Sequence, residues 1–558
     1  MKNPLHKLSL IIFMVFATSA WAATVIDTEE ALQTVLQKRL LNDRTGVCMT
    51  AAIISDKTIK ANVCANPKAM RAIDDQTAFE IGSITKTMTA ILLAEMMQRG
   101  LMNLDAPLVD YLPKGTQVPS FQGKPILLRH IVTHTSGLSA LPPDFAPTDA
   151  ANPYANLTET SLLASLAKAQ LKQAPGEVQS YSNFAMMALS LAIANKAGIS
   201  YELLLKERIF QPLEMSGAYI NDDNKPKQIT AAIGHLPTQA VTSPWTFPNN
   251  LAGVGGVRAT LPDMIKYAKA QLGRNLNANT ELSKAIAKTQ ELMPIANGRP
   301  IGMNWFMRKS ASSEILFHGG GTGGFSTEIL IDKKGGRAVV VLADTSLTNL
   351  GGVSDVALHL LNPDNPIGEA RLVTEATEAL LDALVGDYVL EGGLPMTLRK
   401  KGRRLSAQAA GQPEFELGYD SRGDFYPLAF DASLRPEKLS AGYRFIWLQG
   451  GGAQVAKRVV PGGEKIAAVV ISDKELQRYI GTYNLAPNFD IKFFMEAGKF
   501  YAQATNQPKF LMTAVGGTKF ILEAIPAEIE FLSSDGVAID SLELTQHGRK
   551  TKARRVVQ

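Results

Sequence analysis

Ser83 and Lys86 have the residue types and the spacing that nucleophilic catalysis requires. They stand three residues apart at the start of an apolar, helix-like run that stops at Gly100, so the sequence places both on one face of a helix near its N-terminus. A serine hydroxyl needs a base to remove its proton, and a lysine desolvated in a cleft can serve because burial lowers its pKa. The helix N-terminus adds positive potential where an oxyanion forms. The pair therefore predicts acyl transfer through Ser83.

Two further segments could complete such a site, although none of the three patterns is specific alone. Tyr181-Ser182-Asn183 follows a Pro-Gly pair, and His318 opens a run of glycines that would let backbone approach a substrate closely. Each short pattern has a competitor: Ser-x-x-Lys recurs at residues 165–168, and Tyr-x-Asn recurs at 154–156 and 219–221. Order and context favour the first set, because Ser83 opens a long apolar helix after a strand-like run.

Residues 40–360 resemble the penicillin-recognising serine hydrolases, because the three segments occur in the order and rough spacing typical of that family. This family includes class C β-lactamases, D-alanyl-D-alanine carboxypeptidases, D-aminopeptidases and related esterases. Residues 131–138 form a turn typical of the family, with a structural role, and residues 112–125 look like the peptidoglycan-directed members.

The resemblance implies a role for each residue of the three segments. Ser83 would be the acylated nucleophile, Lys86 its proton partner and Tyr181 the general base, with no metal or cofactor. The substrate-binding residues would be Asn183, which orients the substrate amide, His318 and Gly320, together with Gly321, whose N–H would form the oxyanion hole with that of Ser83.

His318 departs from the family pattern, because β-lactamases usually carry the lysine of a Lys-Thr-Gly triad at that position. A lysine is a permanent cation that suits a substrate carboxylate, whereas histidine is only partly charged near neutral pH. Histidine here is familiar among D-peptidases and D-aminopeptidases, so the departure weakens the expectation of efficient β-lactam hydrolysis.

The same resemblance implies an α/β fold of the β-lactamase/transpeptidase type: an antiparallel sheet with flanking helices plus a helical lobe. Two small all-β, barrel-like modules should follow. We expect a signal peptide at residues 1–22, the hydrolase domain at 23–370, and the two β modules at 371–470 and 471–558.

The two β modules are predicted from an internal repeat. Residues 385–388 match 480–483, and residues 407–413 match 502–508, both at an offset of 95 (385 to 480 and 407 to 502). The module ends, 456–460 and 553–557, match at an offset of 97. Constant offsets with short strand-like runs indicate two copies of one β unit, and neither copy shows a nucleophile–base pair. Their role stays open between restricting which substrates enter, on one side, and stabilising the hydrolase domain or mediating self-association, on the other.

The first 22 residues have the pattern of a secretory signal. Lys2 and Lys7 precede a short apolar run, and Ala20-Trp21-Ala22 forms a cleavage site. We therefore expect a periplasmic or secreted protein without a membrane span after cleavage, a retained anchor being the alternative. The net charge is +5 over 558 residues, without a long basic run before the last few residues, which argues against nucleic-acid binding.

Cys48 and Cys64, the two cysteines, flank two β-rich runs around a short polar turn. If Ile54 faces Thr58 in the hairpin, Cys48 faces Cys64, and in an oxidising compartment they would form a disulfide. A turn of different length would leave two unpaired thiols instead.

These observations predict an enzyme that hydrolyses β-lactam or D-Ala-D-Ala-like amide bonds through an acyl-enzyme on Ser83. An esterase or a D-aminopeptidase on the same scaffold is the alternative within the class. A non-catalytic protein that binds cell-wall fragments is the alternative from another class. The partner is a small-molecule or peptide substrate (a β-lactam, a D-amino-acid peptide or an ester), and the sequence leaves the oligomeric state open.

Overall fold

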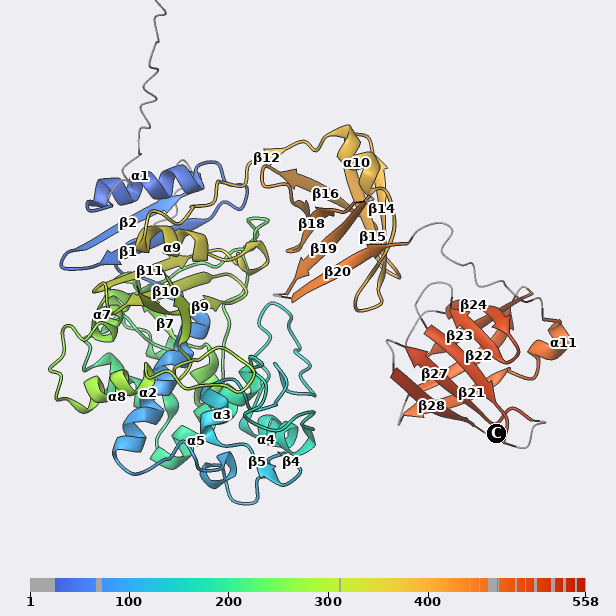
Figure 1. Cartoon of the computed structure of the whole chain (residues 1–558), viewed down its shortest axis with the longest axis horizontal. Helices are drawn as coiled ribbons and strands as arrows, with labels where there is room; N and C mark the ends of the chain where they lie inside the picture. The colour runs from blue at the N-terminus through green and yellow to red at the C-terminus, as the bar shows by residue number, and fades with distance from the viewer. Residues whose placement is uncertain are drawn as a thin grey trace, which may run out of the picture.

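The computed structural model describes residues 26–66, 73–310, 313–440, 442–450, 452–459, 469, 471–486, 489–496, 498–505, 509–522, 527–534, 538–546 and 549–556. The expected signal peptide lies outside these residues. Figure 1 shows an α/β domain followed by two all-β parts, as the sequence predicts. The domain limits near residues 370 and 470 stay predictions.

A six-stranded antiparallel sheet forms the centre of the α/β domain. Its spatial order is β2 (Thr58–Cys64), β1 (Cys48–Ile54), β11 (Arg337–Ala343), β10 (Ser326–Asp332), β9 (Glu314–Gly321) and β8 (Phe306–Lys309). The N-terminal hairpin thus pairs with a strand near the end of the domain.

Helices cover both faces of this sheet, as Figure 1 shows. α1 (Glu29–Leu40) and α9 (Ser354–Leu361) share one core with Met49, Ala51 and Ile53, while Ala52 and Ile54 contribute to the core on the other face. Successive side chains of a strand point to opposite faces, so β1 is buried along its whole length. The second face is covered by α2 (Thr85–Gln98), α7 (Leu261–Gln271) and α8 (Glu281–Thr289).

The residues between β2 and β8 also build a helical lobe and a small sheet. The lobe contains η3 (Leu108–Tyr111), β4 (Ser120–Phe121), β5 (Lys124–Pro125), α3 (Leu128–Val132), α4 (Glu159–Lys168), α5 (Asn183–Ala197), α6 (Tyr201–Leu205), the π turn η4 (Lys206–Phe210), η5 (Asp222–Asn224) and η6 (Asn249–Val254). The small sheet has the order β6 (Thr230–Ala231), β3 (Thr77–Glu80) and β7 (Arg258–Thr260). β3 leads directly into the 3₁₀ turn η2 (Gly82–Ile84), which carries Ser83.

The β1–β2 hairpin has the register that the sequence predicts. Ile54 pairs with Thr58, Cys48 pairs with Cys64, and the two cysteines are joined as a disulfide. The three-residue connection Ser55-Asp56-Lys57 fixes this register.

Each all-β part is a closed antiparallel barrel. The first, which we call barrel 1, follows β12 (Val373–Thr374) and α10 (Glu378–Leu384). Its strands are β13 (Gly386–Leu390), β14 (Pro395–Lys401), β15 (Arg404–Ala409), β16 (Phe415–Asp420), β17 (Phe425–Pro427), β18 (Ser433–Lys438), β19 (Tyr443–Gln449) and β20 (Gly452–Arg458), closed by the β16–β17 and β13–β20 pairings.

The second, barrel 2, follows α11 (Asp473–Leu476) and closes through the β21–β28 pairing. Its strands are β21 (Gly481–Ala486), β22 (Phe489–Glu496), β23 (Lys499–Ala504), β24 (Lys509–Gly516), β25 (Lys519–Leu522), β26 (Ala527–Leu532), β27 (Ser541–Gln546) and β28 (Arg549–Arg555).

Equivalent residues make equivalent contacts in the two barrels, which confirms the internal repeat. The hydroxyl of Tyr388 donates to the carbonyl of Leu384, four residues earlier, and the hydroxyl of Tyr483 does the same to Tyr479. The guanidinium of Arg458 lies 6.0 Å from the centroid of the Tyr388 ring. In barrel 2, the guanidinium of Arg555 lies 5.7 Å from the centroid of the Tyr483 ring.

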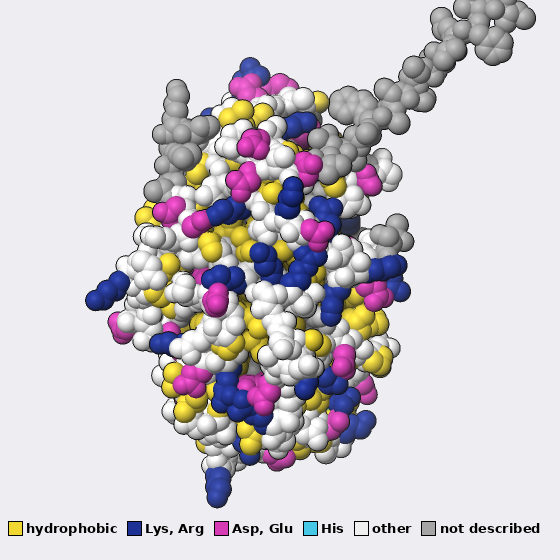
Figure 2. Space-filling model, turned by 90° about the vertical axis from the view of Figure 1, so that its left-hand side faces the viewer, with side chains coloured by type: hydrophobic (Ala, Val, Ile, Leu, Met, Phe, Trp, Pro, Cys, Tyr) yellow, Lys and Arg dark blue, Asp and Glu magenta, His cyan; other side chains and the backbone are white. Residues whose placement is uncertain are grey.

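The surface shows no strong separation of charge on the face in Figure 2, where Lys and Arg side chains are interspersed with Asp and Glu. Within the described ranges, no helix has both the length and the apolar character needed to cross a membrane.

Candidate active site

Ser83 lies in the 3₁₀ turn η2, two residues before α2 begins at Thr85. The sequence predicts a helix from Ser83 onward, whereas the structure has a 3₁₀ turn there that starts at Gly82, whose φ of +51° favours glycine. Ser83 therefore lies just before the N-terminus of α2 and is partly exposed.

Lys86 lies on the first turn of α2 and contacts Ser83 directly. Its Nζ is 2.8 Å from Oγ of Ser83 and donates to the carbonyl of Val254 at 2.7 Å. The side chain is completely buried, no carboxylate among the described residues is paired with it, and this desolvation lowers the pKa of Lys86 well below its ordinary value. This shift moves the amine toward its uncharged form, which can accept the Ser83 proton.

Tyr181 lies just before the N-terminus of α5, and its side chain faces Ser83. Its ring centroid is 4.8 Å from Nζ of Lys86, and its hydroxyl is hydrogen-bonded with Ser83. The ring is 37% exposed, whereas desolvation around the hydroxyl raises the pKa of Tyr181, partly offset by the bond to Ser83. The protonated phenol is therefore favoured when the site is empty.

Asn183 is the first residue of α5, and Ser182 caps this helix through a hydrogen bond from the backbone N–H of Ala185 to its hydroxyl. The amide Nδ2 of Asn183 donates to the hydroxyl of Tyr154 at 3.2 Å. Its Oδ1 is buried without a hydrogen-bond partner. An unpaired buried acceptor suits a substrate N–H.

His318 lies in β9 and is 2% exposed. Its Nδ1 donates to the carbonyl of Gly319 at 2.7 Å, which leaves Nε2 as a buried acceptor with no partner. Desolvation, helped by the nearby Lys86, lowers the pKa of His318 to about 3. The structure therefore favours a neutral imidazole over a cation that would meet a carboxylate.

Glycines allow β9 and the Ser83 turn to approach each other. A Cβ on Gly320 would lie 2.1 Å from the carbonyl oxygen of Ile81, and a Cβ on Gly82 would lie 2.7 Å from the backbone N of Gly321. The hydroxyl of Thr327 also donates to the Ile81 carbonyl at 3.0 Å. These contacts bring the amide of Gly321 beside the Ser83 turn, as an oxyanion hole requires.

The structure adds residues that the sequence had not assigned to the site. The ring of His134 lies 4.4 Å from that of Tyr181, and Phe306 lies 5.4 Å from His318, both measured between ring centroids. His134 has φ +55°, accepts a 3.5 Å hydrogen bond from the Ser182 N–H at Nδ1, and leaves Nε2 buried without a partner. The sequence predicts a structural role for its turn, residues 131–138, and favours the Tyr-x-Asn pattern at Tyr181 over the one that begins at Tyr154.

The competing Ser-x-x-Lys pair lies apart from this constellation. Ser165 and Lys168 belong to α4, and Nζ of Lys168 is paired with Asp144 at 2.7 Å on an exposed surface. Tyr219 is buried against Arg258 in the small sheet. Among the residues that the structure describes, no group of three His, Cys, Asp or Glu side chains is arranged to hold a metal ion.

This fold and this constellation define a penicillin-recognising serine hydrolase. The Beta-lactamase family model matches residues 38–361, more than half of the 558 residues. The chain belongs to the Beta-lactamase family.

Its similarity to individual proteins is moderate. It is 31% identical over 293 residues to D-alanyl-D-alanine-carboxypeptidase/endopeptidase AmpH of Escherichia coli (strain K12), covering 49% of this chain and 73% of that protein. It is 29% identical over 245 residues to a β-lactamase of Yersinia enterocolitica, covering 44% and 59%. A solved class C β-lactamase mutant shares the fold with a TM-score of 0.50 and 22% identity, covering 60% of this chain and 96% of that one.

Proposed function

We propose that this protein is an exported hydrolase that cleaves D-Ala-D-Ala-like peptide bonds, or the related β-lactam amide, through an acyl-enzyme on Ser83. The observation that carries the proposal is the 2.8 Å contact between Ser83 Oγ and a fully buried Lys86 amine. A structural lysine at this depth would need a carboxylate partner, whereas a catalytic one gains from its lowered pKa.

The reaction begins with attack of Ser83 Oγ on the substrate carbonyl carbon while its proton passes to Nζ of Lys86. The N–H groups of Ser83 and Gly321 hold the oxygen of the tetrahedral intermediate. The C–N bond then breaks, and Tyr181 delivers a proton to the leaving nitrogen, replenished from Lys86. The family resemblance gave Tyr181 the role of first base. The raised pKa of Tyr181 and the lowered pKa of Lys86 favour the lysine for that step, with the tyrosine as the relay.

Water then attacks the acyl carbon, with the same two side chains removing its proton, and Ser83 regains its hydrogen as the acid product leaves. Asn183 and His318 orient the substrate rather than transfer protons. Each has one buried, unpaired acceptor, Oδ1 and Nε2, which matches the N–H donors of a peptide.

The neutral His318 provides no permanent cation for a substrate carboxylate, and because a β-lactam and a terminal D-alanine both carry one, this position does not rank the two substrates. The similarity to AmpH, named as a carboxypeptidase/endopeptidase, is what supports a preference for peptides. An esterase or a D-aminopeptidase uses the same machinery and stays the alternative.

One comparison of substrates tests the proposal. The full-length protein is incubated with a fluorophosphonate probe and assayed on nitrocefin, a D-Ala-D-Ala peptide and p-nitrophenyl acetate. We expect covalent labelling at Ser83 and faster turnover of the peptide than of nitrocefin. Absence of labelling and of turnover on all three substrates would instead support a non-catalytic binding protein.

A further inference from the structure

The short turn η7 (Thr348–Leu350) lies against the end of β9 that carries Gly321. Ser326 is the partner of Gly321 across the β9–β10 ladder, and its hydroxyl accepts the backbone N–H of Leu347 at 2.7 Å. Oγ1 of Thr348 is 2.8 Å from the position that a Cβ on Gly321 would occupy. η7 therefore lines the candidate active site next to the proposed oxyanion hole.

The backbone closes η7 on itself. The N–H of Gly351 donates to the carbonyl of Thr348 at 3.3 Å, and that of Gly352 donates to the carbonyl of Leu347 at 2.8 Å. Leu347 and Leu350 are each 7% exposed and belong to the hydrophobic core beneath the turn. Polar contacts from other segments add to this anchoring and can adjust where the closed turn lies.

Barrel 1 and the segment that leads into it supply such contacts. Nδ2 of Asn349, a residue only 5% exposed, donates to Oδ2 of Asp431 at 2.8 Å. The next residue, Leu350, accepts a hydrogen bond at its carbonyl from Nη2 of Arg371 at 3.4 Å. Both middle and end of η7 are thus held from the side of barrel 1.

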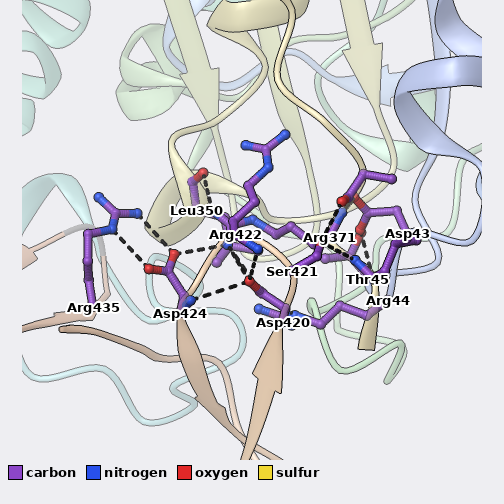
Figure 3. A network of polar contacts seen from close by, with 12 residues as sticks. Asp43, Arg44, Thr45, Leu350, Arg371, Asp420, Ser421, Arg422, Asp424 and Arg435 are labelled. Carbon is purple, nitrogen blue, oxygen red and sulfur yellow. Dashed lines mark hydrogen bonds and ion pairs between the residues drawn. The ribbon is translucent and has the colours of Figure 1, made fainter. Parts of the chain in front are cut away.

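Arg371 is itself fixed by an ion network that Figure 3 shows between the α/β domain and the β16–β17 hairpin. Its Nη1 lies 3.0 Å from Asp420 and 2.9 Å from Asp424, and Arg44 reaches the same Asp420 at 2.9 Å. Three of these four side chains are at least 96% buried, and Arg371 is 95% buried. Buried, mutually paired charges with several hydrogen bonds hold a defined geometry, so this network fixes Arg371 relative to the β16–β17 hairpin.

We propose that Asp431 is a positioning residue for acylation: through Asn349 it holds η7 against β9 and keeps the Gly321 amide in place for the oxyanion. The proposal rests on the proposed function, because it assigns Asp431 a role in the reaction at Ser83. Barrel 1 then contributes to catalysis. The sequence left its role open between restricting substrates and stabilising the hydrolase domain, and this proposal gives it a specific contact instead.

The test uses the full-length protein and three variants. Asp431→Ala removes the acceptor of the Asn349 amide, whereas Asp431→Asn keeps an oxygen that can accept the same hydrogen bond. Arg422→Ala is the matched control, because Arg422 lies in the same interface and contacts the Glu369 carbonyl and Asp355 rather than η7. We measure the rate of fluorophosphonate labelling at Ser83, kcat and KM on p-nitrophenyl acetate, and the melting temperature of each protein.

We expect Asp431→Ala to lower the labelling rate and kcat about tenfold with KM changed less than twofold. Complete removal of an oxyanion donor costs about 10²–10³, and a loosened donor costs less. Asp431→Asn and Arg422→Ala should stay within about twofold of the parent in kcat, the former because it restores the bond. If alanine at 431 prevents folding, Asn349→Leu removes the same bond from the other side and carries the same expectation.

The two proposals fail in different ways. A parent protein that is not labelled at Ser83 would overturn the proposed function. A labelled parent with an Asp431→Ala variant that matches Arg422→Ala in labelling rate and kcat would overturn the role of Asp431 alone. A drop in kcat for Asp431→Ala that only follows its melting temperature, as in Arg422→Ala, would also overturn it.

Discussion

Replacing Glu328 with glutamine should stabilise the α/β domain by roughly 3 kcal/mol at pH 8 and leave it nearly unchanged at pH 4.5. Glu328 lies in β10 opposite Gly319, is 5% exposed, and accepts a hydrogen bond from the hydroxyl of Ser354 at 3.1 Å. Burial raises the pKa of Glu328 from 4.5 to about 7, with smaller opposing effects from Ser354 and Arg308.

The sign and size follow from this shift. An acid whose pKa is raised by folding holds its proton more tightly in the folded state, so stability is greatest below pH 4.5 and falls as the pH rises to about 7. The difference of about 2.5 pH units corresponds to roughly 3 kcal/mol, at about 1.4 kcal/mol per unit. Glutamine resembles the protonated acid and avoids this cost at high pH.

The assay is urea unfolding of parent and Glu328→Gln proteins between pH 4.5 and 8, followed by a signal specific to the α/β domain, such as loss of Ser83 labelling. Other titrating groups cancel in the difference between the two proteins. A difference that stays constant across this range would refute the reasoning, because it would show that Glu328 does not change its charge at a shifted pKa.

The remaining predictions concern the site and the hairpin. Ser83→Ala should abolish covalent labelling and lower turnover by roughly 10⁶, measured by intact-protein mass and a substrate assay; full labelling of this variant would contradict the assignment. Because burial lowers the pKa of His318 to about 3, the KM for nitrocefin should show no inflection from this residue between pH 5 and 8, and His318→Lys should lower that KM. A parent inflection near pH 6.5 that the lysine variant lacks would show a charged imidazole instead. Replacing Cys48 and Cys64 by serine should cost roughly 3 kcal/mol in the chain-entropy model, measured by denaturant unfolding, and two free thiols in the non-reduced parent would contradict the disulfide.

Most of the correct sequence-based predictions rest on local patterns. The register of the β1–β2 hairpin follows from the length of its turn, which places Cys48 beside Cys64. The two barrels follow from a repeat whose matching residues, such as Tyr388 and Tyr483, make the same side-chain contact in each copy. Both inferences depend on residues close in sequence or duplicated along it.

Local sequence patterns could not predict contacts between distant segments. Asn349 and Asp431 are 82 residues apart and belong to no motif, so only the docked barrel brings them together. His134 lies in a turn whose spacing gives no sign that its ring packs on Tyr181. The charge state of His318 depends on its burial, which the glycine-rich pattern around it does not fix.

The order of strands in the central sheet also determines when the α/β domain can be completed during synthesis. Met49 in β1 pairs with Ala343 in β11, which is translated 294 positions later (343 − 49). At about 5–20 residues per second, the ribosome needs roughly 15–60 s to deliver the missing strand. Until β11 is available, β1, with all seven residues buried in the complete fold, has β2 as its sheet neighbour on one side and an open apolar edge on the other.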